Sequence, residues 1–92
     1  MASKKIQVRL KVKVSSHFFR AYVDENRVRF ENDEAALFLE PKGKDYVLTW
    51  FIRDAPGTKY GIQVAEPERA KMTYAATLDA SGKDAGIYWF KI

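Results

Sequence analysis

One segment near the N-terminus constrains the fold more than any other feature of this chain. Residues 5–14 read KIQVRLKVKV, and apolar and polar residues alternate strictly along them. A helix would scatter these apolar residues around its circumference, whereas a strand collects them on one face. That face would carry Ile6, Val8, Leu10, Val12 and Val14. The sequence therefore predicts a β-strand that buries one side in a core.

Similar short segments follow along the rest of the chain. Residues 18–23 and 27–30 flank a polar stretch at 24–26, which predicts a β-hairpin with a three-residue loop. Further strands are predicted over 45–53, 59–67, 70–79 and 87–92, with turns at 41–44 and 54–58 and a loop at 80–86. Two stretches stay ambiguous. In 31–41, a helical turn capped by Asn32 or Asp33 competes with a strand over 36–40, and 66–68 could begin a helix.

Seven or eight short strands with no secure helix indicate an all-β protein. We predict an antiparallel β-sandwich, with the 92 residues forming a single domain over 1–92. The chain has no cysteine, so neither a disulfide nor a thiolate is available. No apolar stretch approaches the roughly 20 residues of a membrane span, and none resembles a signal peptide. We expect a soluble protein, with the cytoplasm slightly favoured.

The expected core follows from the alternation. It consists of the inward-facing apolar residues Val8, Leu10, Val12, Phe30, Leu48, Trp50, Ile52, Ile62, Val64, Tyr88 and Phe90. Residues 45–53 are unusual because both of their faces are apolar: Tyr46, Leu48, Trp50 and Ile52 lie on one, and Val47, Thr49 and Phe51 lie on the other. Such a strand is either covered on both sides or presents its second face to a partner.

The segment DAGIYWF, residues 84–90, resembles the Asp-x-Gly-x-Tyr-x-Cys run of immunoglobulin-type domains, in which the tyrosine forms a corner with the preceding loop. Asp84, Gly86 and Tyr88 match that motif, and Phe90 stands at the position of its cysteine. Trp50 would correspond to the buried tryptophan of the central strand, and Leu37 or Phe38 to the first cysteine. The resemblance implies a sandwich that is immunoglobulin-like in outline, with Tyr88 as its corner.

Residues suited to catalysis or metal binding are few. His17 is the only histidine, and it lies beside Ser15 and Ser16 without the glycines of a nucleophile elbow. Residues 79–84 place three oxygen-bearing side chains around a glycine, yet they lack the acid spacing of a calcium loop. We therefore expect a protein that is not an enzyme and that has no catalytic residues, metal site or cofactor.

Basic residues are concentrated in the first third of the chain. Residues 1–30 carry eight Lys or Arg against Asp24 and Glu25, a net charge of +6, whereas residues 31–92 carry eight against ten, a net charge of −2. A possible basic binding face consists of Lys5, Arg9, Lys11 and Lys13, extended by Arg20, Arg27 and Arg29. With Phe18, Phe19 and Tyr22 nearby, it could bind single-stranded nucleic acid. Lysines that protect an edge strand from aggregation would explain the same pattern.

The competing interpretation is a non-catalytic interaction module or assembly subunit. It would act through a sandwich face or an edge strand, with a protein partner or a second copy of the chain. Its basis is the two-faced apolar character of 45–53 and 87–92. A sugar site at Trp50 or Trp89 is a third possibility and needs an exposed ring. We predict the interaction module, with nucleic-acid binding as the alternative.

Overall fold

The structure is a computed structural model that describes residues 5–14, 18–41, 43 and 45–92. These residues form eight strands and one short 3₁₀ helix: β1 (Ile6–Lys13), β2 (Phe18–Val23), β3 (Asn26–Val28), β4 (Glu34–Leu39), β5 (Tyr46–Arg53), β6 (Lys59–Glu66), η1 (Glu68–Ala70), β7 (Met72–Thr77) and β8 (Lys83–Phe90). In the described part of the chain, no helix is long and apolar enough to cross a membrane.

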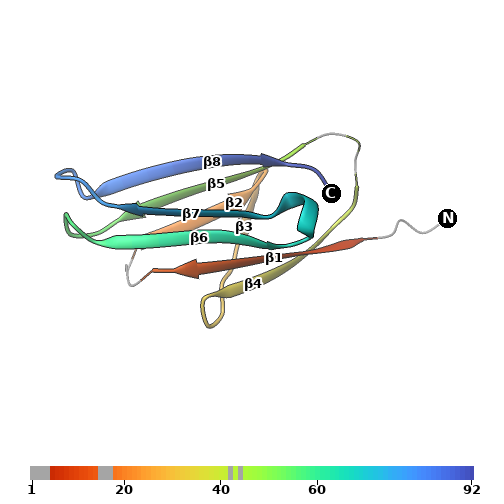
Figure 1. Cartoon of the computed structure of the whole chain (residues 1–92), viewed down its shortest axis with the longest axis horizontal. Helices are drawn as coiled ribbons and strands as arrows, with labels where there is room; N and C mark the ends of the chain where they lie inside the picture. The colour runs from red at the N-terminus through yellow and green to blue at the C-terminus, as the bar shows by residue number, and fades with distance from the viewer. Residues whose placement is uncertain (1–4, 15–17, 42, 44) are drawn as a thin grey trace.

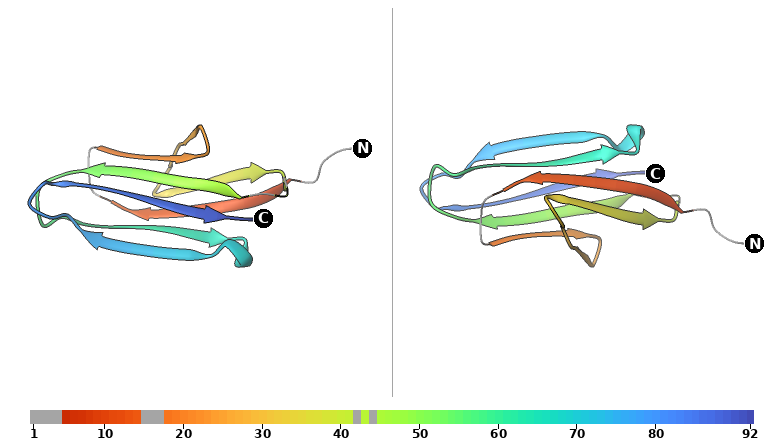
Figure 2. Two further views of the ribbon diagram at one scale, coloured as in Figure 1. Left: turned by 90° about the horizontal axis from the view of Figure 1, so that it is seen from above. Right: turned by 90° about the horizontal axis from the view of Figure 1, so that it is seen from below.

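The strands form two antiparallel sheets that pack face to face, as Figure 1 shows. The first sheet has the order β4-β1-β6-β7, and the second has the order β3-β2-β5-β8. The views from above and below place β7 and β8 along the same margin of the two layers (Figure 2). The predicted antiparallel β-sandwich is therefore confirmed.

The strand predicted at 5–14 is β1, and it lies between β4 and β6. It is an interior strand, so protection of an edge does not explain its lysines. Its pairing with β6 shifts register between Arg9 and Leu10, which leaves Ala65 as an extra residue in β6.

Several boundaries differ from the predictions, and three of these differences change a turn or a strand. The β2–β3 hairpin has a two-residue loop, because Asp24 adopts a positive φ of 53° and Val23 pairs with Asn26. Only the 3₁₀ turn η1 lies between the end of β6 at Glu66 and the start of β7 at Met72. Strand β8 begins at Lys83 rather than 87, because it pairs with β5 along its whole length.

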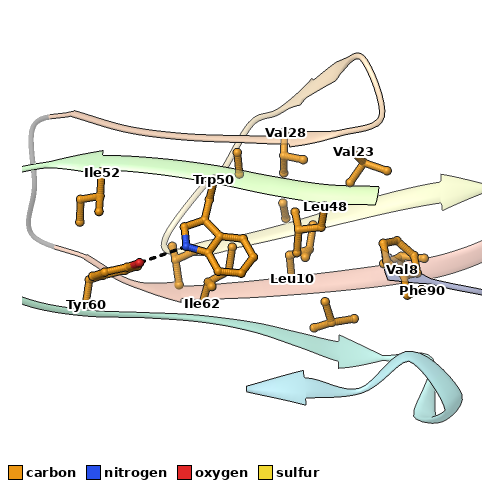
Figure 3. Close-up of a cluster of buried hydrophobic side chains, with 14 of the residues drawn as sticks. Val8, Leu10, Val23, Val28, Leu48, Trp50, Ile52, Tyr60, Ile62 and Phe90 are labelled. Carbon is orange, nitrogen blue, oxygen red and sulfur yellow. Dashed lines mark hydrogen bonds between the residues drawn. The ribbon is translucent and has the colours of Figure 1, made fainter. Parts of the chain in front are cut away.

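The core lies between the two sheets, and its buried residues are all aliphatic or aromatic (Figure 3). Of the predicted core residues, nine are buried, and Phe30 and Tyr88 are partly buried against them. The prediction missed Ala21, Val23, Val28, Ala35, Tyr60, Ala70 and Leu78. Most of these are small residues or come from strands too short to show a clear alternation.

Trp50 occupies the centre of this core and depends on a glycine opposite it. Gly86 of β8 pairs directly with Trp50 of β5. A Cβ atom at residue 86 would overlap the Cζ2 and Cε2 atoms of the indole. Gly86 therefore makes room for a large ring inside the sandwich, and its backbone φ is not in the left-handed region.

A short hydrogen-bond chain links the two sheets beside this ring. The Trp50 indole Nε1–H donates to the Tyr60 hydroxyl at 3.1 Å (Figure 3), and that hydroxyl donates to Asp84 Oδ2 at 2.7 Å. Burial, followed by the bond to Asp84, raises the pKa of the Tyr60 hydroxyl far above its usual value of 10. Tyr60 therefore stays neutral, and it satisfies the only polar atom of a buried indole.

The structure places a tyrosine corner at a residue other than the predicted one. The Tyr46 hydroxyl donates to the Glu40 carbonyl at 2.6 Å and so closes the β4–β5 connection. Tyr88 donates instead to the Ala70 carbonyl at 2.9 Å, in η1, and not to the loop before β8. The assignment of Tyr88 as the corner was therefore wrong.

Candidate interaction surface

The outer surface of the second sheet is the most distinctive surface of the molecule. In β5, Leu48, Trp50 and Ile52 point into the core, so Val47, Thr49 and Phe51 point outward. Strand pairing extends this outward set to neighbouring residues of β2 and β8. We call the resulting apolar surface the aromatic face; its members are Phe18, Tyr22, Val47, Phe51, Ala85, Ile87 and Trp89.

Several members of the aromatic face are strongly exposed. The exposed fractions are 61% for Trp89, 57% for Ile87, 48% for Phe51 and 40% for Phe18. The register places Trp89 beside Val47, and Ala85 beside Phe51. These residues are contiguous across β8 and β5, so they form one patch and are not scattered single side chains. Soluble monomers rarely expose a large patch of this kind unless it binds something.

Two arginine side chains pack near the Phe18 ring at one end of the aromatic face. The guanidinium carbon of Arg20 lies 4.7 Å from the centroid of the Phe18 ring, and that of Arg53 lies 5.4 Å from it. The Phe51 ring contacts Tyr22 edge-on, with 6.5 Å between centroids. These contacts place guanidinium groups beside aromatic rings on the exposed surface, an arrangement that cation–π attraction favours.

Within the strands of the second sheet, the charged residues at outward positions are of one sign. The outward strand positions of the second sheet that carry charge, as far as the structure describes them, are Arg20, Arg27, Arg53 and Lys83. No carboxylate occupies an outward position in these described strands. The outward side of these strands therefore combines apolar and cationic side chains, and aromatic residues and arginine often dominate binding energy at interfaces.

The outer surface of the first sheet is different. Arg9 approaches Glu66 at 3.9 Å, and Lys11 approaches Glu34 at 3.6 Å, both between neighbouring strands. Among the described residues of this surface, one large apolar side chain is strongly exposed, that of Phe38 in the edge strand β4. Paired charges and polar side chains therefore dominate this surface, a pattern typical of a solvent-facing sheet.

The predicted basic face is divided by the fold. Arg9, Lys11 and Lys13 lie on the outer surface of the first sheet, and Lys5 precedes β1. Arg20 and Arg27 lie on the outer surface of the second sheet, on the opposite side of the molecule, and Arg29 follows β3. The structure brings Arg20 together with Phe18, but it does not bring all seven residues onto one surface.

The other candidate residues behave as loop or core residues where the structure describes them. Ser15, Ser16 and His17 lie outside the described residues. In the 79–84 turn, Asp79 Oδ1 accepts hydrogen bonds from the Ser81 hydroxyl and N–H, and these bonds lower the pKa of the Asp79 carboxyl. Asp84 points toward Tyr60 instead, so the oxygens of this segment do not converge. Among the described residues, no three His, Cys, Asp or Glu side chains cluster as metal ligands.

The two tryptophans have opposite environments. Trp50 is buried in the core, so it cannot stack on a sugar. Trp89 is exposed on β8, but it belongs to the larger aromatic face. Sequence reasoning identified the two-faced strands 45–53 and 87–92. It missed that their outward sides are adjacent and that Phe18, Tyr22 and Ala85 belong to the same surface.

The chain matches no protein-family model, and neither a curated protein nor a solved structure shows significant similarity to it.

Proposed function

We propose that this protein is a non-catalytic interaction module that binds a protein partner through the aromatic face. The observation that carries the proposal is the contiguous exposure of Phe51, Ile87 and Trp89 on adjacent strands. Covering such a surface removes apolar area from water, a gain of about 25 cal/mol for each Å² buried. The flat geometry of a sheet suits another folded surface better than it suits a small ligand, which prefers a deep pocket.

The architecture supports such a role. We propose that the sandwich is immunoglobulin-like in outline, on the basis of the corner hydrogen bond of Tyr46 and the buried Trp50. Rigid sandwiches present faces and edges without rearranging their cores. The functional proposal itself rests on the aromatic face, because function depends on the site and not on the fold.

Binding of single-stranded nucleic acid is the second candidate. It is supported by the rings and guanidinium groups that lie together at Phe18, Arg20 and Arg53. Rings that stack on bases and arginines that bind phosphates are the usual elements of such sites. The basic residues of β1 contribute less to this alternative, because they lie on the other sheet and Arg9 and Lys11 have carboxylate neighbours.

Site-specific photo-crosslinking tests the proposed face. A photoreactive phenylalanine analogue replaces Trp89 or Phe51 in separate variants of the full chain, and Gln63 serves as the matched control. Gln63 lies on β6 at a partly exposed position that points away from the core of the first sheet. We expect protein adducts in the native cell from residues 89 and 51, and none from residue 63. Equal adduct formation from all three would refute the proposal.

Salt dependence separates the two candidates. A complex formed mainly through phosphates should weaken steeply between about 50 and 200 mM salt, by roughly a thousandfold if many phosphates are neutralised. A complex formed through the aromatic face should weaken only slightly over that range. Adducts that contain nucleic acid, formed only at low salt, would favour the second candidate.

A further inference from the structure

Strand β7 is an unprotected edge of the first sheet. It pairs with β6 on one side only, and Figure 2 shows it at the margin of its layer. Its residues, Met72–Thr77, include no charged residue and no proline, and its pairing with β6 shows no register shift. Natural proteins usually protect an edge with charges, proline or a bulge, because a bare edge pairs with other strands.

The backbone of β7 offers hydrogen-bonding groups along this edge. The Leu78 N–H donates to the Thr58 carbonyl at 2.8 Å, and the Leu78 carbonyl accepts from the Gly57 N–H at 2.8 Å. Every second residue in an antiparallel strand bonds toward the same neighbour. The N–H and C=O groups of Thr73, Ala75 and Thr77 consequently point to the open side.

We infer that two copies of this chain pair through β7, antiparallel about a two-fold axis at Ala75, so that their first sheets join into one continuous sheet. The inference is independent of the proposed function, because the aromatic face lies on the other sheet. A two-fold axis makes the interface self-complementary, so each residue meets its counterpart twice.

The side chains of β7 match one another in this register. Thr73 would lie opposite Thr77 of the second copy. Just outside β7, Lys71, which approaches Glu68 of its own chain at 3.5 Å, would lie opposite Asp79, and each pair would occur twice. Threonine pairs and pairs of opposite charge stabilise adjacent antiparallel strands. The hydrogen bonds from Ser81 hold the Asp79 carboxylate in place and favour its charged form. On the inner side, Ala76 would cover Tyr74, which is 37% exposed in the single chain.

The other edges lack this complementarity. Pairing β4 with its own copy about Leu37 would oppose Glu34 to Glu40, and pairing β8 about Ile87 would oppose Lys83 to Lys91. Moving the two-fold axis to Ala36 in β4, or to Gly86 in β8, removes the repulsion between like charges but brings no opposite charges together. Strand β3 is short and would oppose Arg27 to itself. Among the edges that the structure describes, β7 is therefore the one that best fits a second copy.

Sedimentation velocity on the full chain tests the inference, from about 10 µM to about 1 mM protein. We expect a reversible monomer–dimer equilibrium. The variant Ala75→Lys places like charges against each other on the axis and should raise the dimer Kd about fivefold. Ala36→Lys is the matched control, because Ala36 is an exposed alanine that points outward from the opposite edge strand, β4. This control should leave the Kd unchanged.

Amide hydrogen exchange on the unmodified chain gives a second test that does not depend on how a variant folds. Exchange at Thr73, Ala75 and Thr77 should slow as the protein concentration rises, while exchange at Tyr74 and Ala76 should not change. A chain that remains monomeric throughout overturns the inference. A dimer whose Kd is unchanged by Ala75→Lys but which is lost with Trp89→Ser also overturns the inference. That result would assign self-association to the aromatic face and leave the proposed function in place.

Discussion

Substitution of Gly86 by alanine is the sharpest test of the packing. The new methyl group would overlap the indole of Trp50, a residue that is only 2% exposed and whose Nε1–H donates to the Tyr60 hydroxyl. The ring cannot move outward without breaking that bond, and the opposite sheet prevents it from moving further inward. We therefore expect a cost near the upper end for overpacked cores, about 3 kcal/mol.

A smaller effect opposes this cost. Alanine restricts the unfolded chain more than glycine does, which contributes about 0.5–1 kcal/mol of stability in a strand. The net loss in the free energy of unfolding should be about 2 kcal/mol. For a domain of this size, that loss lowers the Tm by about 8–16 °C.

Urea unfolding followed by far-UV circular dichroism measures this difference without relying on the two tryptophans. Gly61→Ala is the matched control, because Gly61 also lies within a strand, yet a Cβ atom there would meet the Tyr74 carbonyl oxygen at an ordinary 3.4 Å. This variant should be as stable as the parent or slightly more stable. If Gly86→Ala is equally harmless, the described packing of Trp50 against β8 is incorrect.

A double-mutant cycle identifies the cause of the loss. In a Trp50→Phe background the smaller ring leaves space, so Gly86→Ala should cost at least about 1 kcal/mol less than it does in the parent. An identical cost in both backgrounds would indicate that backbone strain, and not the indole, is responsible.

Three further predictions concern the polar groups. Tyr60→Phe removes the hydroxyl between Trp50 and Asp84 and leaves the indole N–H unpaired, so the free energy of unfolding should fall by about 1–3 kcal/mol in urea titrations; an unchanged midpoint would contradict the hydrogen-bond chain. Ultraviolet titration should show one tyrosine that stays neutral above pH 10, because burial raises the pKa of Tyr60. The free energy of unfolding should fall as the pH rises past 10, because Tyr60 then ionises in the unfolded chain but not in the folded one. Carboxyl NMR titration should find the pKa of Asp79 below 3.8, and its stabilising contribution should be present above pH 3.8 and lost as the pH falls. Ser81→Ala should return this pKa toward 3.8, and an unchanged pKa would refute the assigned cause.

The local pattern predicted which residues form strands and which sides of those strands are apolar. Alternation has a period of two and depends only on neighbouring residues, so Leu48 and Phe51 could be assigned to opposite faces from the sequence. The same reasoning failed for residues 83–86, which contain Lys83, Asp84 and Gly86 and look like a loop. They are strand because β5 pairs with them, and Gly86 is required there by Trp50.

Other local predictions failed because they depend on contacts between distant segments. The motif ending in Tyr88 matched a corner pattern, but the corner hydrogen bond is made by Tyr46. The choice depends on which tyrosine lies near a free carbonyl after folding. Strand pairing decides that, and the pairing of strands leaves no signal in a short motif.

The candidate surface shows the same division. The amino-acid sequence by itself determined that residues 45–53 and 87–92 are apolar on two sides, because side-chain alternation is a property of the extended chain. Only the tertiary structure decided that Phe51 and Trp89 share one uncovered surface, and that Arg9 and Arg20 lie on opposite sides of the molecule. The assignment of each strand to a sheet depends on the packing of the whole core, and therefore on contacts between residues far apart in the chain.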